Sequence, residues 1–238
     1  MTKSYNQFCP VSKAVEIVGE RWTPLVLREM LLGATHFNDI RRGVPLMSPA
    51  LLSKRLKDLE GAGVVRRISA PGKRATEYRL TEVGEDLKPI VVALGLWGHR
   101  WLEKKLGRNE LDAGYLMWDM RRRIDPTAMP GVMQGGRQVV QFDYPDAAKA
   151  MRRWWLVVEG MEVDLCQSDP GYEVNLYISA GLAAMTQVWL GDRDLLRAVA
   201  DDEIVLIGDG DIRDSIGKWL KLSAFAEAAK GMEGGMAC

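Results

Sequence analysis

The chain has 238 residues, of which 47% are hydrophobic and 27% charged. This balance is typical of a globular protein with one or two domains, and it excludes disordered and fibrous classes. No run of about 18 apolar residues occurs, so no membrane contact is expected, and the polar start MTKSYNQFCP lacks a secretory signal, which favours a cytoplasmic location. Three scattered cysteines and two histidines predict no disulfide framework, no metal site and no cofactor.

The net charge of zero conceals an asymmetry between the two halves of the chain. Residues 1–110 carry 19 Lys and Arg against 12 Asp and Glu, whereas residues 111–238 carry 13 against 20. The first half would therefore be attracted to a polyanion such as nucleic acid, and the second half would not. Charge alone does not separate this interpretation from random fluctuation, so the pattern of elements has to decide.

Helix signals dominate the first fifty residues. Pro10 is expected to begin a short helix. Thr23 is expected to act as the N-cap of a second helix, which directs Leu25 toward a core and ends at Gly33. A third, short helix is expected over residues 37–42, before two residues that break helices.

Ser48 and Pro49 repeat the cap-and-proline signal and begin the most clearly two-sided helix, expected over residues 49–62. Its leucines recur at spacings of four and three, so they form one narrow apolar stripe. The leucines of this stripe are Leu52, Leu56 and Leu59. The opposite side carries Ser53, Lys54 and Lys57, which are either a binding face or an ordinary solvated face.

Two β-prone stretches, residues 64–69 and 76–80, follow that helix and flank a turn with two cations. Thr81 is expected to cap a last helix that runs to about Leu106, with a kink at Pro89. This order of helix, turn, two-sided helix and basic hairpin is that of a winged helix-turn-helix. An α-helix fits the major groove of DNA. The DNA-binding residues expected are Arg41, Arg42, Ser48, Pro49, Ser53, Lys54, Lys57, Lys73 and Arg74.

Residues 9–102 resemble an HxlR-type transcriptional regulator. The resemblance rests on the Cys-Pro near the start, Gly19-Glu20-Arg21-Trp22-Thr23, Ser48-Pro49 with Leu51-Leu52-Ser53, and Thr76-Glu77-Tyr78. It implies a homodimer that pairs through its terminal helices. The dimer-interface candidates are Leu94, Trp97 and Trp101. Cys9 matches the cysteine that responds to oxidants or electrophiles in the thiol-sensing members of the family. The alternative, which the sparse cations nearby favour, is a small buried apolar residue at the start of the first helix.

The second half predicts a different architecture. A helix is expected over residues 111–123, a loop over residues 125–136, and then five strands with helices between and after them. Residues 137–230 more weakly resemble a sterol carrier protein-like domain, which implies an apolar tunnel for a lipid-like or aromatic ligand. The tunnel-lining candidates, which could also be plain core, are Trp154, Trp155, Met185, Trp189, Leu220 and Phe225.

The fold expected is therefore α+β, with a winged helix-turn-helix for DNA binding and dimerisation over residues 1–110, a linker over 111–136 and a sterol carrier-like ligand domain over 137–238. The function expected is that of a regulator that binds double-stranded DNA as a homodimer, controlled by a small hydrophobic effector or by thiol chemistry. The alternative is a lipid-binding protein that uses the winged helix mainly for dimerisation. No catalytic set of residues is visible in the sequence, so an enzyme is not expected.

Overall fold

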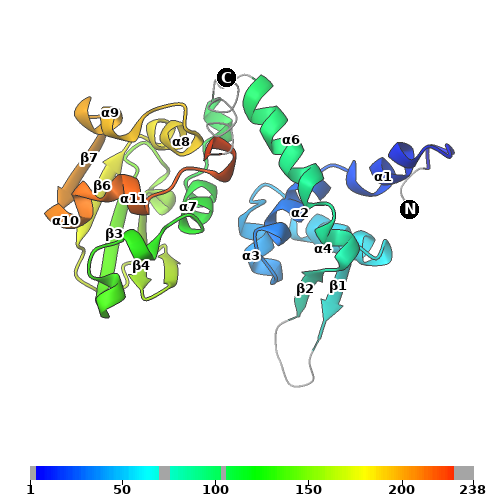
Figure 1. Ribbon diagram of the computed structural model, residues 1–238, viewed down its shortest axis with the longest axis horizontal. Coiled ribbons are helices and arrows are strands. Elements are labelled where there is room, and N and C mark those ends of the chain that lie inside the picture. Colours follow the sequence, from blue (N-terminus) through cyan, green and yellow to red (C-terminus); the bar gives the residue numbers. More distant parts are fainter. Residues whose placement is uncertain (1–3, 70–75, 103–105, 228–238) are drawn as a thin grey trace, which may run out of the picture. The chain divides into compact units, whose positions relative to one another are not determined.

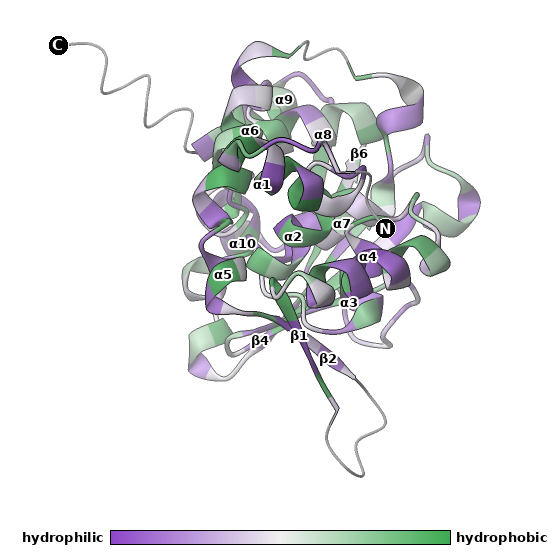
Figure 2. Cartoon of the chain, turned by 90° about the vertical axis from the view of Figure 1, so that its right-hand side faces the viewer, coloured by the Kyte–Doolittle hydropathy of each residue, from purple (hydrophilic) through white to green (hydrophobic). Residues whose placement is uncertain are grey.

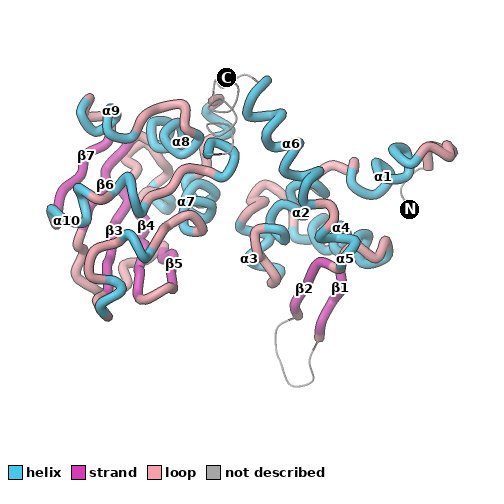
Figure 3. The backbone as a smooth tube through the Cα atoms, viewed as in Figure 1, coloured by secondary structure: helices cyan, strands magenta, loops and turns pink. Residues whose placement is uncertain are grey.

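The computed structural model describes residues 4–69, 76–102 and 106–227, and it divides the chain into two compact units, Met1–Gly95 and Leu96–Cys238. Figures 1 and 3 show the elements of both units. The elements of the first unit, together with the helix that crosses the boundary, are α1 (Pro10–Val18), α2 (Thr23–Leu31), α3 (Phe37–Arg42), α4 (Pro49–Gly61), β1 (Val65–Ile68), β2 (Glu77–Leu80), α5 (Glu82–Glu85) and α6 (Lys88–Trp101).

The core of the first unit lies between α2, α3, α4 and the hairpin of β1 and β2. Leu52, Leu56 and Leu59 of α4 are buried there, as the spacing predicts, together with Val26 and Val65. The strands pair antiparallel, with Val65 opposite Leu80. We call this hairpin, which packs beside α4, the wing. The leucine side of α4 faces the core that the wing helps to form.

Two details of the first unit differ from the sequence expectations. The N-cap of α2 is Trp22, in the left-handed region at φ 78°, whereas Thr23 is the first helical residue and its buried hydroxyl has no hydrogen-bond partner among the described residues. Leu25 is exposed. Helix α2 therefore presents to the core a face that does not include Leu25 and that does include the neighbouring Leu27.

The helix expected from Thr81 onward is two helices. Thr81 caps α5 by accepting a hydrogen bond from the backbone N–H of Gly84, at 3.2 Å. Helix α5 ends at Glu85 and α6 begins at Lys88. Pro89 explains the separation, because proline has no N–H to donate to an earlier carbonyl and fits only the first turn of a helix. Instead of the expected kink, the helix is interrupted between Glu85 and Lys88.

The second unit is a five-stranded sheet with helices packed on one face. Its elements are α7 (Ala113–Arg121), β3 (Arg137–Asp143), β4 (Arg153–Glu159), β5 (Glu162–Cys166), β6 (Leu176–Ala180), α8 (Leu182–Leu190), α9 (Leu195–Ala200), β7 (Ile204–Gly208), α10 (Gly210–Asp214) and α11 (Ile216–Trp219). The strand order is β5-β4-β3-β6-β7. Only β3 and β6 are parallel, and every other neighbouring pair is antiparallel.

The core of the second unit lies between the sheet and its helices. Phe142, Leu156 and Trp219 are buried in it. Residues 111–136, expected as a linker, supply α7 and part of this core, including Met117 and Val132. A smaller cluster on the other face of the sheet contains Val139, Trp155 and Val157.

Among the described residues, no helix is long and apolar enough to cross a bilayer. The same residues contain no group of three or more metal-binding side chains.

Candidate nucleic-acid interface

Helix α4 packs on the core with one side and leaves the other side exposed to solvent. Ser48 is its N-cap, and the Ser48 hydroxyl accepts a hydrogen bond from the backbone N–H of Leu51, at 3.3 Å. Pro49 follows at the first helical position, where its missing N–H costs nothing. The buried leucine stripe turns the other side outward, and Ser53, Lys54 and Lys57 are exposed on it. Figure 2 shows α4 as a largely hydrophilic helix.

Arg55 is the cation of α4 that does not face solvent. Its side chain is only 9% exposed. It donates hydrogen bonds to Glu20 (2.6 Å), to Asp58 (3.1 Å) and to the backbone carbonyl of Arg21 (3.3 Å). Residue type alone does not predict this inward position, although a helical turn of roughly 100° per residue places position 55 beside the leucine stripe. Arg55 thus ties α4 to the segment between α1 and α2.

The turn that precedes α4 has its own fixed geometry. Glu29 of α2 is completely buried, and Arg28 donates hydrogen bonds both to its carboxylate (2.8 Å) and to the carbonyl of Gly43 (2.9 Å). The Glu29 carboxylate fills the place of a side chain at position 43, because a Cβ there would lie 1.8 Å from Glu29 Cδ. A larger residue at position 43 would have to displace this buried carboxylate, which Arg28 holds in place.

Cations outside α4 surround this interface. Arg41 and Arg42 lie exposed in the last turn of α3, with Arg42 3.3 Å from Asp39. Lys73 and Arg74, expected at the tip of the wing, lie outside the described residues. The wing strands add three exposed arginines that the sequence analysis did not single out, Arg66, Arg67 and Arg79. The sequence signal for them was the presence of cations within two short β-prone stretches that flank a basic turn.

Cys9 is the N-cap residue of α1. The backbone N–H groups of Ser12 and Val11 stabilise its thiolate, which lowers the pKa of this thiol below that of an ordinary cysteine. Cys166 on β5 differs, because burial and the nearby Asp164 raise the pKa of its thiol. The two cysteines are therefore placed in opposite electrostatic environments.

The apolar side chains expected at a dimer interface are exposed in the single chain. Leu94, Trp97 and Trp101 are 55%, 58% and 65% exposed. Their spacings of three and four place them along one side of α6. Large apolar patches on a protein surface are typical of interaction sites.

The expected tunnel residues do not share one lining. Met185, Trp189 and Leu220 border a cavity of about 10 Å³, which is the space of a single water molecule. Trp154 is buried in the same core, and Phe225 is partly buried. Trp155 belongs to the cluster on the opposite face of the sheet, because neighbouring strand residues point to opposite faces.

Comparison with known proteins places this site in context. The model of the HxlR-like helix-turn-helix family matches residues 17–106. Over 100 residues the chain is 37% identical to the uncharacterized HTH-type transcriptional regulator YvaP of Bacillus subtilis, a match that covers 41% of this chain and 93% of YvaP. It is 41% identical over 100 residues to the uncharacterized HTH-type transcriptional regulator Mb3122 of Mycobacterium bovis, covering 41% of this chain and 61% of that protein. The solved structure of the redox regulator HypR in its reduced form is 33% identical, with a TM-score of 0.36 over 38% of this chain and 90% of HypR.

Proposed function

Because the chain belongs to the HxlR-like helix-turn-helix family, we propose that it regulates transcription by binding specific sites in double-stranded DNA through α4. Its relatives are named as transcriptional regulators, which are not enzymes. The observation that carries the proposal is the outward side of α4, where Ser53, Lys54 and Lys57 are exposed opposite the buried leucine stripe. Side chains so placed can reach base edges and phosphates in the major groove.

Positions around α4 add contacts to the DNA backbone. Arg41 and Arg42 precede the helix, and the Ser48 hydroxyl with the positive end of the helix dipole faces the groove. Lys73 and Arg74 would extend the contacts along the wing. We assign the phosphate contacts to these residues and the reading of bases to Ser53, Lys54 and Lys57, because base contacts specify sequence whereas phosphate contacts position the protein.

The test is the affinity of the full chain for its selected operator at several salt concentrations. Removing both lysines of α4, as Lys54→Ala with Lys57→Ala, should weaken binding at least ~10-fold. The slope of log affinity against log salt should change little, because the phosphate contacts that set this slope are assigned to other residues. The measurement is fluorescence anisotropy with a labelled duplex.

The matched control removes two exposed lysines of the second unit, Lys149→Ala with Lys218→Ala. This variant has the same change in net charge and should keep the affinity and the salt slope of the parent. If the α4 variant binds as the parent does, or if the control loses as much, then α4 does not read the DNA.

The functional form of the regulator is, in our proposal, a homodimer that pairs through α6. The exposed stripe of Leu94, Trp97 and Trp101 supports this pairing. Two copies of α4 would then meet successive major grooves about one helical turn apart, which predicts an inverted repeat in the operator.

Control of the regulator is proposed through Cys9 or through a hydrophobic effector. The lowered pKa of the Cys9 thiol supports the first route, because the thiolate is the reactive form of cysteine. The second route would place the effector of a sterol carrier-like domain near Met185, Trp189 and Leu220. Since their cavity is about 10 Å³, binding there requires side chains of the core to move.

A further inference from the structure

An open hollow lies in the first unit behind the wing. Its volume is about 290 Å³, close to the lower end of the range for small-molecule sites, roughly 300–1,000 Å³. The end of α2, the two wing strands and α5 enclose it, and every residue that lines it belongs to the first unit. The hollow is therefore complete without the second unit.

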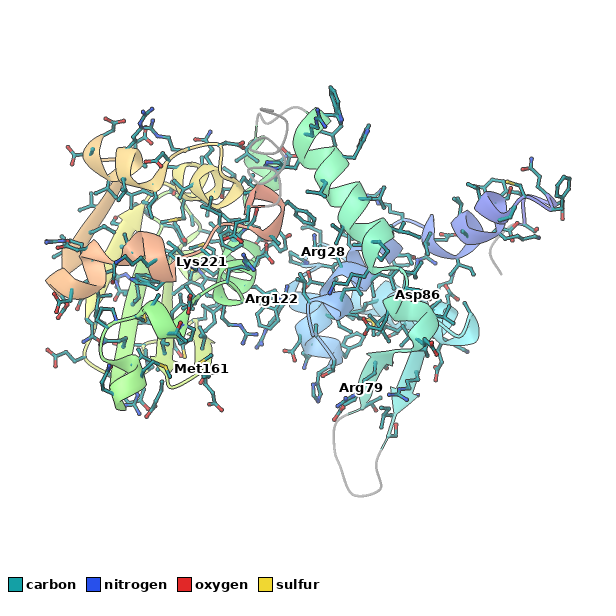
Figure 4. The ribbon with its side chains drawn as sticks, viewed as in Figure 1. Arg28, Arg79, Asp86, Arg122, Met161 and Lys221 are labelled. Carbon is teal, nitrogen blue, oxygen red and sulfur yellow. The ribbon has the colours of Figure 1, made fainter. Side chains whose placement is uncertain are left out.

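Two arginines face each other across the wing at this hollow. Arg66 of β1 is paired directly with Arg79 of β2, and both line the hollow. The neighbouring Val65 is buried with the leucines of α4, so Arg66 lies on the face of the wing that points away from α4. Figure 4 shows Arg79 on the wing. Like charges in directly opposite positions are unfavourable by themselves, which indicates that this pair suits an anion.

The two cations differ in the ion pairs that the described residues give them. Arg79 donates two hydrogen bonds to one oxygen of Glu77, at 2.8 and 3.0 Å. Among the described residues, no side chain forms an ion pair with Arg66. One positive charge is left over, and an incoming carboxylate could bridge the two guanidinium groups with charge-assisted hydrogen bonds.

The rest of the wall determines which kind of anion fits. Met30, Ala34 and Leu80 give the hollow an apolar side, and the exposed carboxyl group of Glu85 lies at its border. A bare inorganic anion would fill little of the hollow, and Glu85 would repel a multiply charged one. A single carboxylate with a small apolar body satisfies both sides of the hollow.

We propose that this hollow binds a small organic carboxylate through Arg66 and Arg79 and that the ligand adjusts DNA binding. The effect of the ligand on DNA binding rests on the proposed function, whereas the binding of the ligand does not. Strand β2 is bonded to the segment between α2 and α3, because the backbone N–H of Tyr78 donates to the carbonyl of Thr35, at 2.7 Å. Strand β1 packs on α4 through Val65. A ligand that bridges both strands would thus fix the wing relative to α2 and α4.

The test uses benzoate as the probe, with the full chain, titrated by isothermal calorimetry and by backbone amide NMR shifts. Benzamide has the same shape without the charge and should not bind, and inorganic phosphate should bind at least ~10-fold more weakly than benzoate. Arg66→Gln and Arg79→Gln should each weaken benzoate binding ~10-fold, which corresponds to the loss of one charge-assisted contact. Arg67→Gln is the matched control, since Arg67 neighbours Arg66 on the other face of β1 and does not line the hollow.

Each other outcome overturns the proposal in its own way. Equal binding of phosphate and benzoate would mark an adventitious anion only. Loss of benzoate binding in Arg67→Gln as well would show a diffuse charge effect. If benzoate does not bind while the parent still binds its operator, the hollow is no ligand site and the regulator assignment stands. If Arg66→Gln instead weakens operator binding with no benzoate bound to the parent, the arginine pair belongs to the DNA interface.

Discussion

Individual residues of α4 have separate roles that their chemistry alone does not reveal. Lys54, Arg55 and Lys57 are all cations within four positions, yet only the two lysines are exposed. Arg55 is drawn inward because Glu20 and Asp58 offer it two carboxylates and Arg21 offers a carbonyl. The partner Glu20 is 35 residues away in the chain, so no local pattern could predict the pair, although the helical period alone indicates that position 55 is beside the leucines.

Replacing Arg55 should therefore reduce stability. In Arg55→Met the hydrocarbon stem is largely kept, but Glu20, Asp58 and the Arg21 carbonyl lose their donor. Since both carboxylates are more than a third exposed, water replaces part of the loss, and we expect a reduction of ~1–2 kcal/mol in the free energy of unfolding. Urea unfolding followed by circular dichroism measures it. Lys57→Met is the control and should change stability by less than about 0.5 kcal/mol; an equal loss in both variants would contradict the role of Arg55.

The two described cysteines should differ in reactivity with pH. The Ser12 and Val11 N–H groups lower the pKa of Cys9, whereas burial and Asp164 raise the pKa of Cys166. A lowered pKa means that the thiolate forms at a lower pH, so alkylation of Cys9 by iodoacetamide should reach half its maximal rate at a lower pH than alkylation of Cys166. Peptide mass spectrometry of a Cys238→Ser chain measures both rates in one sample. The reverse order of midpoints, or coincident midpoints, would remove the basis for thiol control.

At the scale of elements, the sequence predicts strands and caps better than helix continuity. The second unit contains the five expected strands, and Ser48 and Thr81 cap helices as expected, whereas Thr23 does not cap α2. The helical stretch of residues 210–219 is divided at Ser215 into α10 and α11. The Ser215 hydroxyl donates to the carbonyl of Asp211, at 2.7 Å, and such local bonds compete with regular helix.

For the candidate ligand site, the sequence could not predict which face of the sheet each tryptophan of β4 occupies. Trp154 and Trp155 are adjacent and equally apolar, and one-dimensional reasoning placed both in one lining. Strand geometry sends them to opposite faces, so Trp154 packs with the main core and Trp155 with Val139 and Val157. Which face a strand residue takes depends on pairing with distant strands, which the alternation within β4 alone does not fix, because both of its faces are buried.

At the scale of the whole molecule, the charge asymmetry has a structural counterpart. The cationic half of the sequence holds the winged helix, and the acidic half holds the sheet unit, whose core is separate from that of the first unit. The hydrophobic pattern of residues 111–136 could not show that α7 belongs to the second core, because helices of either unit have the same period. Long-range packing determines which core α7 joins, and this packing is visible only in the structure.

Assembly is the property of the whole molecule on which the proposed DNA recognition depends. If α6 pairs two copies, Trp97→Glu with Trp101→Glu introduces two charges into an apolar interface. Interface tryptophans are often worth ~2 kcal/mol or more each, and each substitution occurs in both copies, so the dimer dissociation constant should rise at least about a thousandfold. Sedimentation velocity at micromolar concentration should then show a monomer, and affinity for an inverted-repeat operator should fall toward that for a single half-site.

The control for that measurement is Leu196→Glu on α9, which changes an equally exposed apolar residue, 67% exposed, away from α6. It should sediment as the parent does and bind the operator with unchanged affinity, because an isolated exposed leucine needs no partner. A parent chain that is already monomeric at these concentrations would contradict pairing, and so would a tryptophan variant that stays dimeric. In the second case the exposed side of α6 would have to be explained by contacts other than those between two copies of this helix.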